Sequence, residues 1–301
     1  MPYGYWGKVL KVDLTTGEMA VDSPPEEFYR RYGGGSCLAL AYMLREMVPG
    51  LDPFDPRCLL IFAPSVVTGA PLSGLSRFNV TAKSPLTGTI GDSQGGGVWG
   101  AELKMAGLDA VVITGRAECP VYLWIHGGTD GDSANGDDVS RCEIRSAEHL
   151  WGLDTGPAQA RIREELGDRR VRVAQIGIGG ENLVRYAAIV NELHHFNGRT
   201  GMGAVMGSKN LKAIAVRGHG KVQVHDPAAL LSLARSVPDR IEGNGGSQVL
   251  RDLGTAGFVG AVNAGGGLPT RNFRSGVFEG AGALDGDVMH RDFFHSSTTC
   301  Y

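Results

Sequence analysis

The chain has 301 residues, of which 42% are hydrophobic and 20% charged, and its formal net charge at pH 7 is -3. This composition is typical of a globular protein with a sizeable core, arranged as one large domain or two ordinary ones, and it excludes an intrinsically disordered chain. The nearly balanced charge gives no reason to expect nucleic acid or an acidic membrane surface as a partner.

The chain carries five cysteines, Cys37, Cys58, Cys119, Cys142 and Cys300, and none is spaced like a metal clip within these residues. The first residues contain no apolar signal region, and no run approaches the roughly 18 apolar residues of a membrane span. We therefore expect a reducing cytoplasm as the compartment and no membrane contact.

The N-terminal residues predict a hairpin followed by a helix. Alternating apolar and charged residues over 10–14 indicate a half-buried strand, and Thr16-Gly17 turns the chain toward a partner strand at 19–21. Ser23 is then expected to cap a helix that has proline in its first turn and Glu26 three residues on.

The following elements mix short strands with helices. Apolar or β-branched runs predict strands at 58–63, 78–83, 110–114, 121–126, 171–176, 185–190 and 213–216. Helices are predicted at 38–47, 98–106 and 157–166, with an acidic glycine-rich loop at 127–138. Asp226 then caps a helix that runs to Val237, so the pattern predicts an α+β fold with a domain boundary near 218–224.

Glycine is the compositional outlier, with 46 residues gathered in several clusters. Glycine permits positive φ and lets the backbone approach a ligand closely, so several clusters in one chain indicate a large ligand held by main-chain groups. A set of ordinary tight turns is the alternative reading of each cluster taken alone.

Two segments in the first half carry chemistry suited to an anion. Arg77 begins a predicted strand that ends in the turn 84–88, and a guanidinium suits a phosphate or the edge of a heterocycle. A surface arginine beside an ordinary turn is the alternative. Gln94, Gly95, Gly96 and Gly97 form a glycine-rich loop before a predicted helix, where free backbone N–H groups can bind an anion.

A third glycine-rich segment spans 197–210. It fails the phosphate-loop pattern because five residues separate Gly201 from Gly207 and Ser208 precedes Lys209. It is interpreted as a glycine-rich loop whose arginine and lysine suit phosphate contact.

The segments that carry a family resemblance follow the family's order along nearly the whole chain. They are 4–7 (GYWG), 13–17 (DLTTG), 77–88, 95–104, 201–216 (GMGAVMGSKNLKAIAV), 268–273 and 276–279. Together they resemble the N-terminal half of the tungsten-containing aldehyde:ferredoxin oxidoreductases. The last of the long segments, 201–216, is the most specific.

This resemblance implies a fold and a cofactor. Residues 1–217 are expected to form a tungstopterin-binding domain of two packed β-sheets with flanking helices, and 218–301 the truncated start of a mostly helical domain. The first domain would support a tungsten (or molybdenum) bis-pterin with Mg²⁺ bridging the pterin phosphates. Members oxidise small aldehydes to carboxylates and pass electrons through a 4Fe–4S cluster to ferredoxin or another electron-transfer protein; a homodimer is left open.

The resemblance also implies roles for single residues near the glycine loops. Arg77 matches an arginine placed between the pterin and the cluster. Gln94, ahead of Gly95–Gly97, falls where the family often has an asparagine whose main-chain carbonyl reaches the magnesium ion, and a carbonyl ligand tolerates a changed side chain. The run 33–38, GGGSCL, departs from the family, which commonly has an arginine near Ser36.

Further along the chain, Arg199 and Thr200 match a second phosphate-side contact, which continues through Gly201 and Gly203. Cys300 matches the first cysteine of the family's Cys-x-x-Cys-x-x-x-Cys run, and the chain ends one residue later. The resemblance assigns no catalytic acid or base within these residues.

Three function hypotheses remain open on the sequence. The leading one is the cofactor-binding portion of a tungsten oxidoreductase, inactive as a fragment because one cysteine cannot hold a cluster. The second is a non-catalytic cofactor-binding module, or a subunit that another chain completes. The third, a generic nucleotide-binding protein, is disfavoured because both the phosphate-loop and the Rossmann glycine patterns fail.

Overall fold

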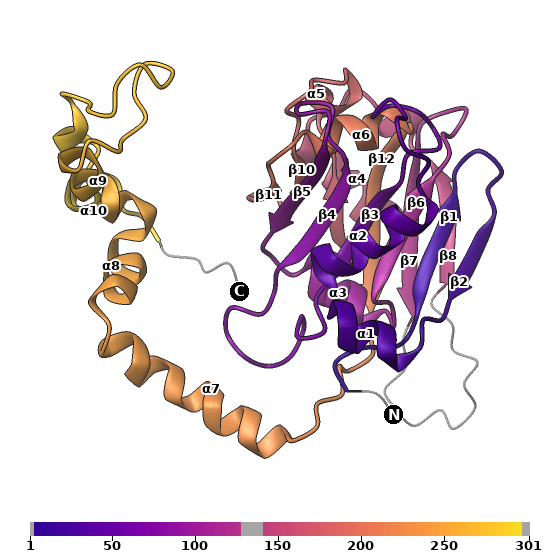
Figure 1. Ribbon diagram of the computed structural model, residues 1–301, viewed down its shortest axis with the longest axis horizontal. Coiled ribbons are helices and arrows are strands. Elements are labelled where there is room, and N and C mark those ends of the chain that lie inside the picture. Colours follow the sequence, from indigo (N-terminus) through magenta and orange to yellow (C-terminus); the bar gives the residue numbers. More distant parts are fainter. Residues whose placement is uncertain (1–2, 128–140, 297–301) are drawn as a thin grey trace. The chain divides into compact units, whose positions relative to one another are not determined.

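The computed structural model describes residues 3–127 and 141–296, and its contacts divide the chain into two compact units (Figure 1). The first unit is Met1–Pro227 and the second is Ala228–Thr299, and each is described by itself. Within the described residues, no helix has the length and apolar character needed to cross a bilayer. The assignment of cofactor binding to 1–217 and of a helical domain to 218–301 stays a prediction.

The first unit contains two six-stranded sheets. The first sheet has the order β2-β1-β6-β3-β4-β5 and is built from Val9–Asp13 (β1), Met19–Asp22 (β2), Leu60–Pro64 (β3), Phe78–Lys83 (β4), Ile90–Gly95 (β5) and Ala110–Thr114 (β6). The second has the order β11-β10-β9-β12-β7-β8 and is built from Val121–Gly127 (β7), Arg141–Ser146 (β8), Arg172–Gln175 (β9), Ile189–Asn191 (β10), His195–Asn197 (β11) and Leu211–Gly218 (β12).

Both sheets are mixed, because β1 pairs with β6 and β7 with β12 in parallel while the other pairs are antiparallel. The helices of this unit are Glu26–Tyr32 (α1), Gly35–Glu46 (α2), Trp99–Met105 (α3), Thr155–Glu165 (α4), Ile178–Glu181 (α5) and Met202–Ser208 (α6), with a 3-10 turn at Glu148–Leu150 (η1). The predicted α+β architecture of two packed sheets with flanking helices is confirmed.

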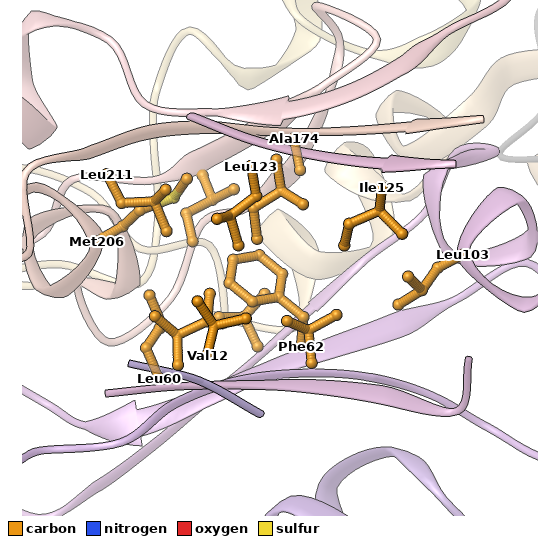
Figure 2. Packing of buried hydrophobic residues seen from close by; sticks show 14 of the residues in the cluster. Val12, Leu60, Phe62, Leu103, Leu123, Ile125, Ala174, Met206 and Leu211 are labelled. Atoms are coloured by element: carbon orange, nitrogen blue, oxygen red, sulfur yellow. The ribbon is translucent and has the colours of Figure 1, made fainter. Parts of the chain in front are cut away.

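The main core lies between the two sheets. Figure 2 shows Val12 and Phe62 of the first sheet facing Leu123 and Ile125 of the second, with all four side chains buried. Burying one such side chain contributes roughly 1.5–3 kcal/mol relative to leaving it in water. Because this layer contains side chains from most strands of both sheets, the sheets cannot be separated without exposing it.

Helices cover the outer faces. Leu38 and Tyr42 of α2 pack on Ile61 of β3, and Ile162 of α4 belongs to the cluster on the outer face of the second sheet. The central strands are therefore buried on both faces, which explains why β3 reads as an uninterrupted apolar run rather than an alternating one.

Several predicted elements coincide with the structure. The strands at 78–83 and 110–114 have the predicted bounds, and Leu10 pairs with Val21 in the predicted N-terminal hairpin. The predicted serine cap is wrong: Pro25 is the residue before α1, and no side chain caps this helix. Ser23 lies two residues before the N-cap position, Pro25.

Other elements differ from the prediction. The strand predicted at 185–190 is reduced to β10, and β8 and β11 were not predicted at all. Both glycine-rich loops are partly regular structure, since β5 extends to Gly95 and α6 begins at Met202. Most of the acidic loop predicted at 127–138 lies outside the described residues.

The second unit is helical, as expected. It contains Pro227–Glu242 (α7) from its second residue on, Gly245–Leu253 (α8), Gly254–Phe258 (η2), Val259–Ala264 (α9), Ala281–Ala283 (η3) and Gly286–Phe293 (α10). Helix α7 runs past the predicted end at Val237 and contains Pro238. Among the described residues of this unit, the buried apolar core is limited to Ala281.

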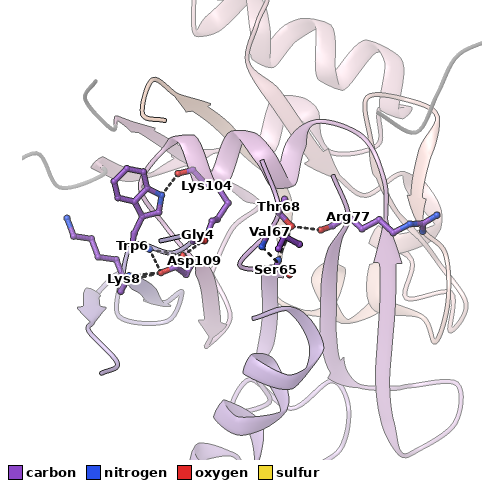
Figure 3. Close-up of polar contacts among 10 residues, drawn as sticks. Gly4, Trp6, Lys8, Ser65, Val67, Thr68, Arg77, Lys104 and Asp109 are labelled. Carbon is purple, nitrogen blue, oxygen red and sulfur yellow. Dashed lines mark hydrogen bonds and ion pairs between the residues drawn. The ribbon is translucent and has the colours of Figure 1, made fainter. Parts of the chain in front are cut away.

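A buried ion pair holds the N-terminal residues against α3. Lys104 Nζ lies 2.6 Å from Asp109 Oδ1, and both side chains are almost completely buried. The Asp109 carboxylate also accepts the backbone N–H groups of Trp6 and Gly7, as Figure 3 shows in part. Lys104 Nζ in turn donates to the carbonyl of Gly4, so one carboxylate and one ammonium fix residues 4–7.

Candidate functional site

The residues around Gln94 form the end of an edge strand rather than a loop. Asn79 of β4 pairs with Gln94, and Phe78 pairs with Gly95, so β5 continues one residue beyond Gln94. Gln94 is exposed, whereas Gly95, Gly96 and Gly97 are buried. The predicted loop is therefore limited to the residues between Gly95 and α3.

Arg77 lies immediately before β4, at the same end of the strand pair as Gly96, because its neighbour Phe78 pairs with Gly95. Thr68 Oγ1 donates to the Arg77 carbonyl at 2.9 Å and fixes its backbone. Figure 3 shows the side chain running away from Thr68, and the residue is exposed. Among the described residues, its guanidinium forms no hydrogen bond or ion pair.

The segment that leads from β11 to α6 runs along β5. The Asn197 amide nitrogen donates to the Ser93 carbonyl at 2.8 Å, and the Arg199 N–H donates to Ser93 Oγ at 3.0 Å. Ser84 Oγ, in the turn after β4, donates to the Thr200 carbonyl at 2.7 Å. The structure thus brings Arg199 and Thr200 next to the strand that carries Gln94, although they lie more than 100 residues apart in sequence.

Gly97 is required by the close approach of this second segment. A Cβ at this position would lie 2.3 Å from both Asn191 Oδ1 and Glu192 Oε2, and the backbone has φ +88°. Either feature excludes an L side chain. The glycine therefore serves the contact between two protein segments, and this does not depend on a ligand.

The predicted loop at 199–203 is also mainly structural. Thr200 and Gly201 have positive φ, and α6 starts at the next residue. A Cβ on Gly201 would lie 1.9 Å from the Arg185 carbonyl oxygen, and one on Gly203 would lie 2.5 Å from that of Ala188. Packing against these carbonyls explains the glycines of the motif, and a cofactor contact of Gly201 or Gly203 stays a prediction.

Lys209 does not suit the predicted phosphate contact. Its side chain is buried, and Nζ donates to the carbonyls of Pro56, Cys58 and Gly115 at 3.1, 2.7 and 3.1 Å. Burial lowers the pKa of Lys209 to about 8. The lysine joins the segment before β3 to the residue after β6, so its role is to connect parts of the fold.

The departure at GGGSCL also has a structural counterpart. Ser36 Oγ, in the first turn of α2, donates to Asp92 Oδ2 at 2.9 Å and accepts from the Asn79 amide at 2.6 Å. Thr81 Oγ1 donates to the other oxygen of Asp92 at 2.9 Å. The small serine is thus part of a side-chain network that joins α2 to β4 and β5.

Free hydrogen-bond donors remain around the end of β5. Within the described part of the chain, the N–H groups of Gly96 and Gly97 form no hydrogen bond, and neither do the exposed guanidinium groups of Arg77 and Arg199. Buried N–H groups are normally paired, so two unpaired ones beside two arginines indicate an anionic group such as phosphate.

One residue of this region, Glu192, was not found from the sequence. Its Oε2 accepts the Val98 N–H at 2.8 Å, and nothing in the local sequence indicates this contact. Cys300, the predicted cluster ligand, lies outside the described residues. In residues 3–127 and 141–296, no three His, Cys, Asp or Glu side chains are grouped so that they could hold a metal ion.

Comparisons with known proteins match along both units. The model of the aldehyde ferredoxin oxidoreductase N-terminal domain matches residues 9–218, and the model of domains 2 and 3 of the same family matches residues 232–301. The tungsten-containing aldehyde ferredoxin oxidoreductases of Pyrococcus abyssi and Thermococcus kodakarensis are each 41% identical over 302 residues. The alignments cover 99% of this chain but 47% and 48% of those proteins, so the chain spans about half of their length.

Relatives with other named activities are similar as well. The aliphatic sulfonate oxidoreductase, WOR-like subunit, of Pyrococcus furiosus is 34% identical over 252 residues, which are 77% of this chain and 38% of that protein. A solved structure, the active site complex BamBC of benzoyl coenzyme A reductase with 1,5 dienoyl-CoA, matches with a TM-score of 0.74 and 36% identity. That match covers 81% of this chain and 35% of the solved one.

Proposed function

This chain belongs to the aldehyde ferredoxin oxidoreductase family, and from that membership we propose that it is the cofactor-binding portion of a tungsten bis-pterin oxidoreductase. The observation that carries the proposal is the group of unpaired donors at the end of β5. Pterin phosphates are anions, and backbone N–H groups with nearby arginines are the protein groups that bind them.

The residues present fit such a cofactor. The N–H groups of Gly96 and Gly97 would bind one phosphate, and the guanidinium groups of Arg77 and Arg199 would neutralise charge. The Gln94 carbonyl would reach a Mg²⁺ ion that bridges the phosphates, in keeping with the oxygen ligands that this ion prefers. Thr200, whose carbonyl accepts from Ser84, would help to hold the arginine-bearing segment against the turn between β4 and β5.

When bound, the tungsten centre supplies the oxygen-atom and two-electron chemistry that converts an aldehyde to a carboxylate, while the protein binds and orients. Cys300 would be the first ligand of the 4Fe–4S cluster that passes single electrons to ferredoxin. Since the chain spans about half of its relatives, the remaining ligands and the substrate pocket would come from further residues. The free thiols among the described residues suit a reducing cytoplasm.

Metal and pterin analysis of the full-length protein tests this proposal. We expect tungsten with two pterins for each metal, and a loss of both in an Arg77→Ala/Arg199→Ala double variant whose thermal unfolding is unchanged. Arg57→Ala, which changes an exposed arginine remote from β5, serves as the matched control. A wild-type protein without tungsten, molybdenum or pterin would contradict the proposal.

A second candidate activity is reduction of an aromatic coenzyme A thioester, because the similar solved structure is the active site complex of such a reductase. The two candidates differ in the direction of electron flow. The full-length protein should reduce ferredoxin when given small aldehydes. Consumption of reduced ferredoxin with an aromatic acyl-CoA, and no reaction with aldehydes, would favour the second candidate.

A further inference from the structure

The hairpin between β10 and β11 turns in an unfavourable conformation. It reverses through Glu192, Leu193 and His194, and both Glu192 (φ 49°) and Leu193 (φ 67°) are left-handed. Residues with a Cβ adopt this region rarely. Such a turn persists where surrounding contacts hold it, and it often accompanies function.

The contact that holds this turn is made by the side chain of Glu192. The residue is 9% exposed, and its Oε2 accepts the Val98 N–H at 2.8 Å. Val98 directly follows Gly97 and precedes α3, so the bond joins the hairpin to the end of the glycine-rich segment.

The hairpin also shapes the space around Gly97. Asn191 is fully buried, its amide nitrogen lies 3.4 Å from the His195 carbonyl oxygen, and its Oδ1 has no N–H or O–H partner among the described residues. Together with Glu192 Oε2, this oxygen lies against the Cα of Gly97. Contacts of a Cα–H group with such oxygens are weakly favourable, so the glycine backbone is held on this side.

As a consequence, the three backbone N–H groups that follow β5 differ in whether they have a hydrogen-bond partner. The Val98 N–H is bound by Glu192, whereas those of Gly96 and Gly97 have no partner among the described residues. We infer that Glu192 is a positioning residue: it fixes Gly97 and Val98 so that the two free N–H groups are held ready for the anionic cofactor. This inference rests on the proposed function and adds to it a residue that touches the loop and not the cofactor.

Length and charge of the side chain can be tested separately. Glu192→Gln keeps an acceptor at the same reach and removes the charge, and the oxygen that it replaces by nitrogen, Oε1, accepts no hydrogen bond in the described structure. Glu192→Asp keeps the charge and is one methylene too short for Val98. Glu165→Ala removes a carboxylate that accepts from Tyr122 on the outer face of the second sheet, and it is the matched control.

The experiment measures amide hydrogen exchange at Val98, together with tungsten and pterin content, in the full-length protein. Exchange at Val98 should be about tenfold faster in Glu192→Asp than in wild type, and the cofactor content of this variant should fall about tenfold. Glu192→Gln and Glu165→Ala should match wild type in both measurements. Loss of cofactor in Glu192→Gln with retention in Glu192→Asp would overturn the inference, because charge and not reach would then matter. Unchanged exchange in both variants would also overturn it.

The same data separate this inference from the proposed function. A wild-type protein without tungsten or pterin would contradict the proposed function. Exchange at Val98 in the variants would then still decide whether Glu192 positions the loop. If Glu192→Asp does not fold, the Glu192→Gln variant decides. Cofactor content and Val98 exchange equal to those of wild type in this variant support positioning through the hydrogen bond. A folded Glu192→Gln protein with fast exchange contradicts it.

Discussion

The buried pair of Lys104 and Asp109 shows how single charged side chains hold this fold together. The carboxylate of Asp109 accepts one ammonium at 2.6 Å and three backbone N–H groups at 2.8 to 3.2 Å. Removing it would leave a buried lysine without its counter-charge, and a broken buried pair costs about 3–5 kcal/mol, far more than an exposed one.

We therefore expect Asp109→Ala to lower the free energy of unfolding by about 3–5 kcal/mol. Urea denaturation followed by circular dichroism measures this change. The control is Asp55→Ala, which removes a partly exposed carboxylate 2.7 Å from Arg57 and should lower the free energy of unfolding much less. Equal effects of the two substitutions would show that the Lys104–Asp109 pair is not the anchor.

The cysteines should differ in reactivity with pH. Burial raises the pKa of the Cys142 thiol to about 12, whereas Cys37 and Cys119 are exposed. The thiolate is the reactive form, so Cys142 should be alkylated by iodoacetamide at least about tenfold more slowly than the exposed thiols at pH 8. Its rate should rise about tenfold with each pH unit and level off only above about pH 12. Mass spectrometry of timed samples measures this, and equal labelling of the three cysteines contradicts it.

Residue roles were predictable from the sequence only where local pattern decides them. Cys58 opens the apolar run 58–63 and is buried, as that run indicates. Lys209 looked like a phosphate contact because it follows glycines, but its carbonyl partners come from segments about 90 to 150 residues away. Glu192 gave no local signal, since its partner Val98 lies 94 residues earlier.

At the level of elements, the glycine-rich segments are where sequence and structure differ most. A high density of glycine indicates turns, so β5 and α6 were predicted from the sequence as loops. In both cases the missing side chain makes room for another backbone or side chain from a distant part of the chain. Strands with β-branched and apolar residues, such as β4 and β6, were predictable because burial on the sheet decides their sequence.

Gly203→Ala tests whether the glycines of α6 serve packing. The added Cβ would lie 2.5 Å from the Ala188 carbonyl oxygen, and overpacking of this kind costs about 1–3 kcal/mol. Gly156→Ala in α4 is the matched control: nothing lies within 4 Å, so the better helix former should raise stability by about 0.5–1 kcal/mol. Thermal unfolding of both variants measures the opposite signs, and a tolerated Gly203→Ala would leave cofactor contact as the reason for this glycine.

On the scale of the whole molecule, the two compact units differ in how much core they contain. The first has an apolar layer between its sheets and a further cluster on each outer face. The second exposes large apolar side chains on its helices and between them, among them Leu231, Leu250, Phe273 and Phe293. Exposed apolar surface of this kind is typical of a region that packs against more protein.

The residues between the predicted boundary and the second unit still belong to the first. Gly4 N–H donates to the Gln223 carbonyl at 2.8 Å, and Gly220 N–H donates to the Met105 carbonyl at 2.7 Å. The ring of Tyr3 also packs edge-on against His225 at 5.0 Å. A cut at 217 would remove these contacts, because they are made by the ten residues that follow it.

We therefore predict that residues 1–227 unfold cooperatively on heating, with an unfolding temperature within about 2–4 °C of that of the 301-residue chain. For a domain of this size, such a difference corresponds to a change of about 1 kcal/mol in the free energy of unfolding. Residues 1–217 should unfold at a clearly lower temperature, because the anchor of the N-terminal residues is then incomplete. Residues 228–301 alone should show no cooperative transition, since the described part of that unit buries almost no apolar side chain. Differential scanning calorimetry of the three fragments and the 301-residue chain measures these unfolding temperatures.

Two outcomes would contradict the prediction. A large drop in unfolding temperature on removing 228–301 would show that the second unit contributes to the stability of the first. Equal unfolding temperatures for 1–217 and 1–227 would show that the contacts of Gly4 and Gly220 are dispensable.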